Sequence, residues 1–178
     1  MHTKLISSLL LVGVAMASQL AAAADGQITF NGEVTAQTCI ISGNGSAEDF
    51  TVTLPTVSTS VLAAEGETAG RTPFNIALTG CTPESGKVRV HFEQGPNVDT
   101  STGRLTLEPG GAQNVQISLL NSDLNSIRIG QSEASQNSLP VAISNGSATL
   151  PFFAEYYATG QATPGVANSN VMYTLTYQ

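Results

Sequence analysis

Few residues in this chain could do covalent or metal chemistry, and the two cysteines are the most conspicuous of them. Cys39 and Cys81 could form a disulfide, bind a metal ion as a pair, or act as reactive thiols. No C-x-x-C motif and no nearby histidine supports the second or third use. A disulfide is the natural inference for a protein that leaves the reducing cytosol, and closing a loop of about 43 residues would stabilise the fold by roughly 4 kcal/mol.

Catalytic groupings are hard to find. His91 is the only histidine outside the N-terminal segment, and it stands between Arg89 and Glu93 on what reads as the polar face of a strand. No glycine-rich loop opens a helix, so phosphate binding is unsupported. Neighbouring carboxylates read as solvated loop charges rather than acid–base pairs; they are Glu48, Asp49, Glu65 and Glu67. We therefore expect no enzymatic activity, no metal and no cofactor.

The N-terminus predicts export. Lys4 precedes an apolar run from Leu5 to Val14, and Ala21-Ala22-Ala23 supplies the small residues that signal peptidases cleave after. Residues 1–24 are therefore predicted to be a signal peptide, with cleavage near Ala23 or Ala24 and a second candidate site after Ala17. A membrane anchor is the alternative interpretation, but the apolar run is well below the roughly 18–20 residues that cross a bilayer.

Charge excludes several partners. Loss of Lys4 leaves five basic residues against thirteen acidic ones in a mature chain of about 154 residues, the size of one domain. The basic residues are scattered through separate strand-like segments. A phosphate backbone requires clustered Lys and Arg, so we expect no nucleic-acid partner, and anionic membrane surfaces are excluded for the same reason.

The rest of the chain reads as β-structure. Short alternating runs bounded by Gly, Pro, Asn and Ser recur along it, with almost no helical periodicity apart from a possible turn at Val61 to Glu67. Asn145-Gly146 is the strongest hairpin signal, because it accepts the positive φ angles of a type I′ turn. An all-β sandwich follows. The predicted strands are Ile28–Thr35, Phe50–Val57, Pro73–Cys81, Lys87–Glu93, Arg104–Leu107, Val115–Leu120, Ser126–Ile129, Val141–Ser144, Ala148–Tyr157 and Val171–Tyr177.

Both ends of the mature chain carry an alternating strand that lacks an obvious partner. At the start, apolar or small residues share one face; they are Ile28, Phe30, Gly32 and Val34. At the end, Val171, Tyr173, Leu175 and Tyr177 alternate up to the penultimate residue. An exposed apolar edge invites pairing with another chain. A donor at one end and an open edge at the other would make head-to-tail filaments, although the two strands could instead pair within one molecule.

Several short motifs, in this order, resemble the chaperone–usher pilins, specifically the type 1 fimbrial major-subunit group. Phe30-Asn31-Gly32-Glu33-Val34 is followed by Cys39 seven residues after the glycine. Gly70-Arg71-Thr72-Pro73-Phe74 leads through Ile76 and Leu78 to Cys81. Gly165 is fourteenth from the end, and Tyr177 is penultimate. The resemblance covers the whole mature chain.

The resemblance implies an immunoglobulin-like β-sandwich that lacks its last strand and is completed by a donated one, with a Cys39–Cys81 disulfide. Residues 25–36 would be the donor-strand arm and residues 37–178 the pilin domain. Ile28, Phe30, Gly32 and Val34 would insert into a neighbour, with Gly32 small because its pocket is shallow. The edge at Val171, Tyr173, Leu175 and Tyr177 would accept that arm and be recognised by the chaperone.

The implied function is a structural subunit of a fimbria that polymerises by donor-strand exchange and supports cell adhesion. The implied partners are identical or related subunits, a periplasmic chaperone and an outer-membrane usher, and the implied location is the cell surface. A minor adaptor or terminator pilin is one alternative. Another is a monomeric extracellular carbohydrate-binding sandwich, but the chain has no Trp for sugar stacking, and Tyr156 and Tyr157 lie in an apolar strand where core packing is expected.

Overall fold

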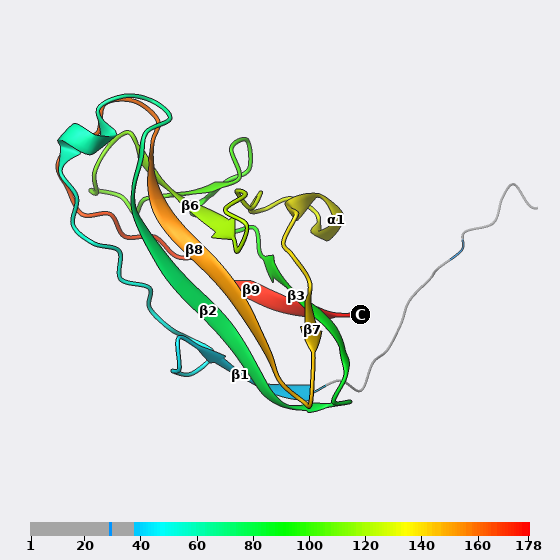
Figure 1. Ribbon diagram of the computed structural model, residues 1–178. Coiled ribbons are helices and arrows are strands. Elements are labelled where there is room, and N and C mark those ends of the chain that lie inside the picture. The colour runs from blue at the N-terminus through cyan, green and yellow to red at the C-terminus, as the bar shows by residue number, and fades with distance from the viewer. Residues whose placement is uncertain (1–28, 30–37) are drawn as a thin grey trace, which may run out of the picture. The chain divides into compact units, whose positions relative to one another are not determined.

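The computed structural model describes residue 29 and residues 38–178 of the chain, and it is built almost entirely of antiparallel strands (Figure 1). Among these residues no helix has the length and apolar composition that crossing a membrane requires. The all-β prediction is confirmed. The strands are β1 (Thr38–Gly43), β2 (Thr68–Thr82), β3 (Gly86–Phe92), β4 (Val98–Asp99), β5 (Arg104–Thr106), β6 (Val115–Asn121), β7 (Val141–Ile143), β8 (Ala148–Ala158) and β9 (Tyr173–Tyr177).

The larger sheet has six strands in the order β1-β2-β8-β6-β5-β4. Its centre is the long pair β2 and β8, which lie side by side in Figure 1 and align Phe74 with Phe152 and Ile76 with Leu150. Alternation explains why this sheet has an inner and an outer face: Leu150 and Phe152 are buried, whereas Thr149 and Pro151 between them are exposed. The inner face thus supplies most of the core.

The smaller sheet has three strands in the order β7-β3-β9. Val88, Val90 and Phe92 of β3 are almost completely buried, as their alternation predicts, and they pack against the inner face of the larger sheet in one core. Strand β9 pairs with β3 over its whole length, from Phe92 with Tyr173 to Val88 with Tyr177. Within the part of the chain that the structure describes, β9 therefore has a ladder partner on one side only.

The hairpin predicted at Asn145-Gly146 connects the two sheets. Strand β7 ends at Ile143, β8 begins at Ala148, and both turn residues have positive φ angles. The predicted disulfide also forms: Cys39 in β1 is bonded to Cys81 in β2. It joins two neighbouring strands at one end of the larger sheet.

Some predicted elements differ from the structure. Residues 50–57 are not part of any strand ladder, and Ser126–Ile129 makes only one isolated bridge, between Ser126 and Leu120. Strands β1 and β4 were not predicted. The expected helical turn begins earlier, as the 3₁₀ helix η1 (Thr59–Leu62), and a second short helix, α1 (Glu133–Gln136), was not expected. The predicted strand Ile28–Thr35 lies outside the described residues except for Thr29.

Candidate functional site

A groove of about 690 Å³ opens between two segments that no ladder joins, residues 48–54 on one side and residues 169–173 on the other. Its floor is the hydrophobic core itself, because both sheets contribute inward-facing side chains to it. These floor residues are Phe74, Ile76, Phe92, Leu105, Ile117, Leu119 and Ala154. The groove therefore reaches down to side chains of the hydrophobic core.

The first flank is the extended segment that leads from β1 to η1. Phe50, Val52 and Leu54 are half-buried, whereas Thr51 and Thr53 between them are exposed, which is the alternation of a strand. No hydrogen bond to another described residue involves the backbone of residues 50–57. The prediction of a strand here was right about the side-chain pattern and wrong about pairing, because no strand among the described residues lies beside it.

The second flank is β9 and the segment before it. On one side its backbone is satisfied: Glu93 N donates to Met172 O at 2.8 Å, and Gln178 N donates to Lys87 O at 2.8 Å. On the other side no described strand follows β9. The predicted acceptor residues lie here, half-buried and in contact with the core; they are Val171, Tyr173, Leu175 and Tyr177.

Tyr173 spans the groove near one end. Its hydroxyl donates to the backbone carbonyl of Glu48 on the opposite flank at 2.9 Å, and its ring lies edge-on to Phe50 with centroids 6.4 Å apart. Burial, with smaller contributions from the Asp49 and Glu48 carboxylates, raises the pKa of Tyr173 above its usual 10.0, so the phenol stays protonated and remains a donor. This side chain ties the two flanks together.

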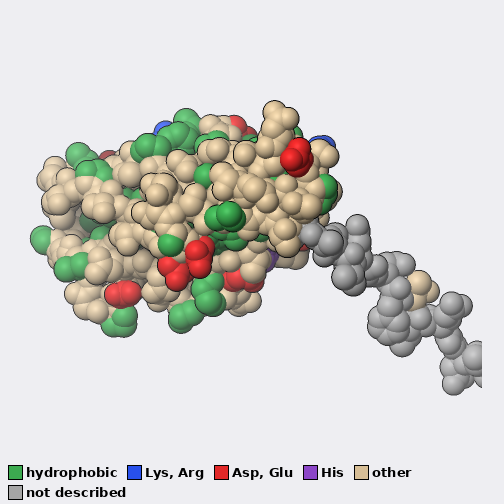
Figure 2. Space-filling model, turned by 90° about the horizontal axis from the view of Figure 1, so that it is seen from below, with side chains coloured by type: hydrophobic (Ala, Val, Ile, Leu, Met, Phe, Trp, Pro, Cys, Tyr) green, Lys and Arg blue, Asp and Glu red, His purple; other side chains and the backbone are tan. Residues whose placement is uncertain are grey.

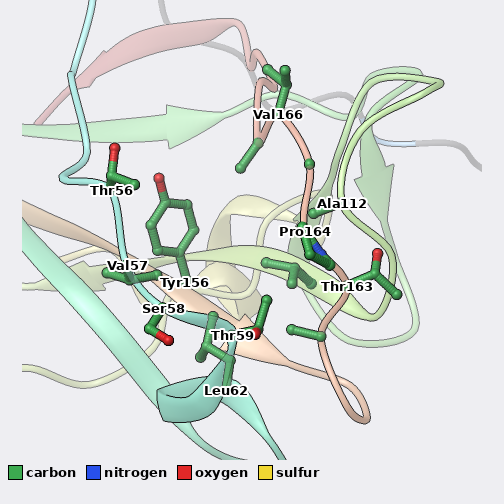
Figure 3. A pocket seen from close by; sticks show the side chains of 14 residues that line it. Thr56, Val57, Ser58, Thr59, Leu62, Ala112, Tyr156, Thr163, Pro164 and Val166 are labelled. Atoms are coloured by element: carbon green, nitrogen blue, oxygen red, sulfur yellow. The ribbon is translucent and has the colours of Figure 1, made fainter.

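A second cavity, of about 280 Å³, lies between the continuations of the same two segments, residues 56–59 and 162–167 (Figure 3). Leu62 and the ring of Tyr156 line its apolar side. Gly165 lies where that segment crosses the backbone of residue 112, since a Cβ on Gly165 would be 2.5 Å from Ala112 N. Ala112 N also donates to Val166 O at 2.8 Å. A glycine is therefore required for the close approach at this end of the groove.

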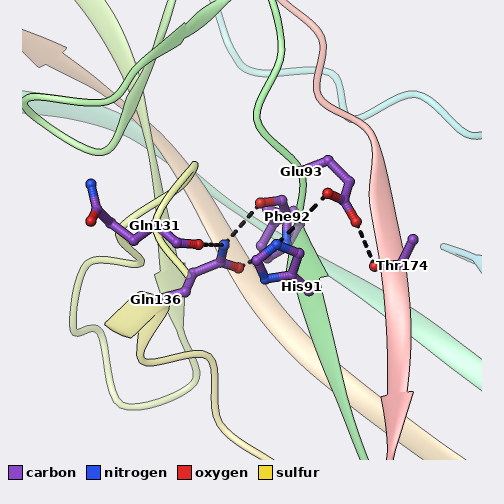
Figure 4. A network of polar contacts seen from close by, with 6 residues as sticks. All are labelled: His91, Phe92, Glu93, Gln131, Gln136 and Thr174. Carbon is purple, nitrogen blue, oxygen red and sulfur yellow. Dashed lines mark hydrogen bonds and ion pairs between the residues drawn. The ribbon is translucent and has the colours of Figure 1, made fainter. Parts of the chain in front are cut away.

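The floor of the groove depends on a buried amide. Gln136 projects from α1 and is 1% exposed; its Oε1 accepts from Phe92 N at 2.7 Å, and its Nε2 donates to Phe92 O at 2.8 Å (Figure 4). Strand β7 pairs with β3 only as far as Val88. Beyond Val88 the Gln136 amide makes the hydrogen bonds that a neighbouring strand would make, and it makes them to Phe92, which forms part of the groove floor.

Few polar and charged side chains border the groove. His91 Nε2 lies 3.7 Å from Glu93 Oε2, and Glu93 Oε1 accepts from the hydroxyl of Thr174 on β9 at 2.7 Å. Within residue 29 and residues 38–178, no three His, Cys, Asp or Glu side chains are grouped to hold a metal ion. Acidic side chains are scattered among hydrophobic ones on the face shown in Figure 2, with basic ones only near its edges. The groove therefore combines an apolar floor with two extended flanks.

The sequence analysis considered one flank of this groove and not the other. It identified the edge at Val171 to Tyr177, but it did not assign Phe50, Val52, Leu54 and Val57 to the opposite flank, although their alternation was visible. The proposed donor residues, Ile28, Phe30, Gly32 and Val34, lie outside the described residues. Of the tyrosine pair expected in the core, Tyr156 is buried there, whereas Tyr157 faces outward beneath the Arg104 guanidinium, 3.5 Å from its ring centroid.

Comparisons with known proteins agree with this architecture. The family model described as Type-1 fimbrial protein, A, matches residues 54–178. The chain is 49% identical over 170 residues to the major fimbrial subunit SMF-1 of Stenotrophomonas maltophilia, an alignment that covers 92% of this chain and 99% of the relative. It is 46% identical over 170 residues to the F17 fimbrial protein of Escherichia coli, covering 92% and 93%.

Solved structures show the same fold. The type I fimbria protein and antigen of Burkholderia pseudomallei is 27% identical with a TM-score of 0.57, covering 79% of this chain and 97% of that one. The P pilus rod subunit PapA is 20% identical with a TM-score of 0.59, covering 79% and 99%. Its similarity shows the fold alone.

Proposed function

Because this chain belongs to the type-1 fimbrial protein family, we propose that it enters its fibre by donor-strand exchange, each subunit filling the groove of a neighbour with its N-terminal arm. The chain is a structural subunit of a chaperone–usher fimbria at the cell surface, and the proposal concerns how such subunits join. It assigns the chain no catalytic role, in keeping with a family of structural proteins.

The observation that carries the proposal is the groove between two flanks that no described ladder joins to each other. Residues 50–57 and β9 each have a backbone edge that pairs with no described strand, and between them Ile117, Leu119 and other core side chains line a cavity of about 690 Å³. One added strand would pair with both edges and cover the core at the same time. The six-stranded and three-stranded sheets would then form a closed sandwich.

In this proposal residues 1–24 are a signal peptide, residues 25–36 are the donor arm and residues 37–178 are the pilin domain. Ile28, Phe30 and Val34 would point into the groove of the next subunit and contribute about 1.5–3 kcal/mol each if fully buried. Gly32 would face a shallow part of that groove. Since the donor and the acceptor are different surfaces, the contact is heterologous and repeats head to tail.

We propose two further partners because a free edge is an aggregation hazard before assembly. A periplasmic chaperone would lend a strand to the groove and recognise the edge at Val171, Tyr173, Leu175 and Tyr177. An outer-membrane usher would then receive the subunit and exchange the chaperone strand for the arm of the next subunit. No cofactor enters any of these steps.

Fibre assembly in cells that express Gly32→Arg tests the proposal. A bulky cation on the inserted face should prevent incorporation into fibres while leaving export and chaperone binding intact. Asn31→Arg is the matched control, because it places the same side chain on the opposite face of the same arm. The readout is surface-sheared material on a denaturing gel, run with and without boiling.

Wild-type chain and Asn31→Arg should give SDS-resistant multimers that collapse to one monomer band on heating. Gly32→Arg should give soluble periplasmic subunit and no multimers. Normal fibre yield from Gly32→Arg, or equal loss in both variants, would contradict the assignment of this face of the arm to the groove.

A further inference from the structure

Two turns of this protein have the same sequence and the same backbone conformation. Asn44-Gly45-Ser46 follows β1, and Asn145-Gly146-Ser147 joins β7 to β8. The asparagines have φ angles of 48° and 49° and the glycines 80° and 69°. Each turn is closed by its serine, whose N–H donates to the carbonyl of Gly43 at 2.8 Å or of Ser144 at 3.0 Å. Any difference in reactivity between them must come from their surroundings.

Asparagine followed by glycine is prone to a reaction that needs only water. The glycine amide nitrogen loses its proton to solvent base and attacks the side-chain Cγ of the asparagine. The new C–N bond forms as the bond to the side-chain nitrogen breaks, and that nitrogen leaves as ammonia with a proton from water. Hydrolysis of the resulting succinimide at one carbonyl or the other gives aspartate or isoaspartate. Glycine favours the attack because it lacks a Cβ that would crowd the ring.

The second turn protects its nucleophile. Gly146 N donates to the carbonyl of Glu84 at 3.0 Å, so the proton that must leave before attack is held in a hydrogen bond. Gly146 O accepts from Cys81 N at 3.0 Å, which holds the peptide from its other side. Gly146 is also buried. Attack on Asn145 therefore requires this turn to open first.

The first turn leaves the corresponding atoms accessible. Gly45 is exposed, nothing lies within 4 Å of the position its Cβ would occupy, and no hydrogen bond from Gly45 N to a described residue forms. Asn44 Oδ1 accepts from Asn75 N at 2.9 Å, which polarises the carbonyl under attack. The Asn44 side-chain nitrogen, the leaving group, donates to no other described residue.

From this contrast we propose that Asn44 is a site of spontaneous deamidation in the folded protein and that Asn145, in an identical sequence, is protected. The proposal does not depend on how subunits join, because the reaction needs only the folded chain and water.

The product would affect the groove. Isoaspartate lengthens the backbone between Asn44 and Gly45, in the turn that positions Gly43, and a Cβ on Gly43 would be 1.8 Å from the ring of Phe50, so that ring lies directly on it. Phe50 belongs to the first flank. The carboxylate also adds negative charge beside Glu48 and Asp49. An aged subunit would thus carry an altered flank.

The test incubates the purified mature chain in heavy-oxygen water at mildly alkaline pH, both folded and in concentrated urea. Digestion and tandem mass spectrometry then follow label incorporation and isoaspartate at each asparagine. In urea the two sites should react at similar rates, because both are Asn-Gly-Ser. In the folded chain Asn44 should react at least roughly five-fold faster than Asn145, the factor that corresponds to one net hydrogen bond.

Equal rates in the folded chain, or faster reaction at Asn145, would overturn the proposal. Gly45→Ala should suppress the reaction at Asn44 and leave Asn145 unchanged, which ties the signal to attack by that nitrogen. Persistence of the signal at Asn44 in Gly45→Ala would also overturn the mechanism.

Discussion

Replacing Gln136 by alanine removes the amide that stands in for a strand beside β3. In the folded protein this amide makes two short hydrogen bonds to the backbone of Phe92, and both residues are almost fully buried. Alanine cannot reach Phe92 N or Phe92 O, so both groups lose their partner on that side. Phe92 forms part of the groove floor and pairs with Tyr173 of β9, so the change reaches the proposed acceptor edge.

The expected cost follows from the two orphaned groups. Each buried backbone group left without a partner costs about 1–3 kcal/mol. Water entering the space vacated by the side chain would recover part of this sum. We therefore expect the free energy of unfolding to fall by about 2–4 kcal/mol, a large fraction of the stability of a domain this size.

Urea unfolding of the mature chain followed by circular dichroism measures this change, provided that the slope with urea stays constant between variants. Gln131→Ala is the matched control: Gln131 is only partly buried and donates one bond, to Thr100 O at 3.0 Å, so its loss should cost about 0.5 kcal/mol or less. Gln136→Glu keeps the shape and the acceptor but loses the donor to Phe92 O, and it should remain clearly destabilised. Equal stability of Gln136→Ala and Gln131→Ala would refute the reasoning.

Three further changes have defined outcomes. Gly165→Ala should push its segment away from Ala112 and lower the unfolding free energy in urea by about 1–3 kcal/mol. Glu155 is only 7% exposed, and Arg71→Ala removes the guanidinium that lies 2.7 Å from its carboxylate. We expect the free energy of unfolding to fall by about 1–3 kcal/mol, and adding Glu155→Gln to this variant should restore part of that loss. A hydrogen bond from Ser101, and a smaller contribution from Gln116, lower the pKa of Asp99 from 3.8 to about 2. The ionised Asp99 therefore stabilises the fold fully above pH 3.8, and this stabilisation is lost as the pH falls through 2.

Each of these outcomes can fail in a recognisable way. Unchanged unfolding of Gly165→Ala would mean that the crossing relaxes without cost. If Glu155→Gln does not improve Arg71→Ala, the lost stability comes from packing of the arginine stem rather than from the carboxylate. Asp99→Asn should flatten the acid limb of a stability–pH curve, and an acid limb identical to that of the wild type would contradict the role of Asp99.

The strands that sequence predicted well are those whose faces differ in polarity. Lys87 to Glu93 alternates between charged and apolar side chains, and the structure buries its apolar members completely. Strand β1 was missed because Cys39, Ile40 and Ile41 are apolar in succession and show no alternation; Ile40 is in fact 69% exposed. Strand β4 has two residues, too few for any period to be seen.

The groove could be predicted only from its C-terminal side. The alternation of Val171, Tyr173, Leu175 and Tyr177 is visible in the sequence and predicts a strand with one apolar face. The opposite flank looked like an ordinary strand, because its pattern is that of one, and only the fold shows that no described strand lies beside Phe50 to Val57. The hydrogen bonds of the Gln136 side chain to the Phe92 backbone could not be predicted from the sequence. The two residues are 44 positions apart, and no local pattern marks a side chain that will bond to a distant strand.

The Cys39–Cys81 bond has a consequence for the first flank of the groove. The flank at residues 50–57 lies inside the loop that this bond closes, and it has no ladder of its own to hold it. Its position therefore depends on what anchors its two ends, and β1, with Cys39, is the anchor at the N-terminal end. The bond therefore ties the first flank of the groove covalently to β2, in addition to the β1–β2 ladder, so a cross-link at one end of the larger sheet also restrains a segment that has no ladder of its own.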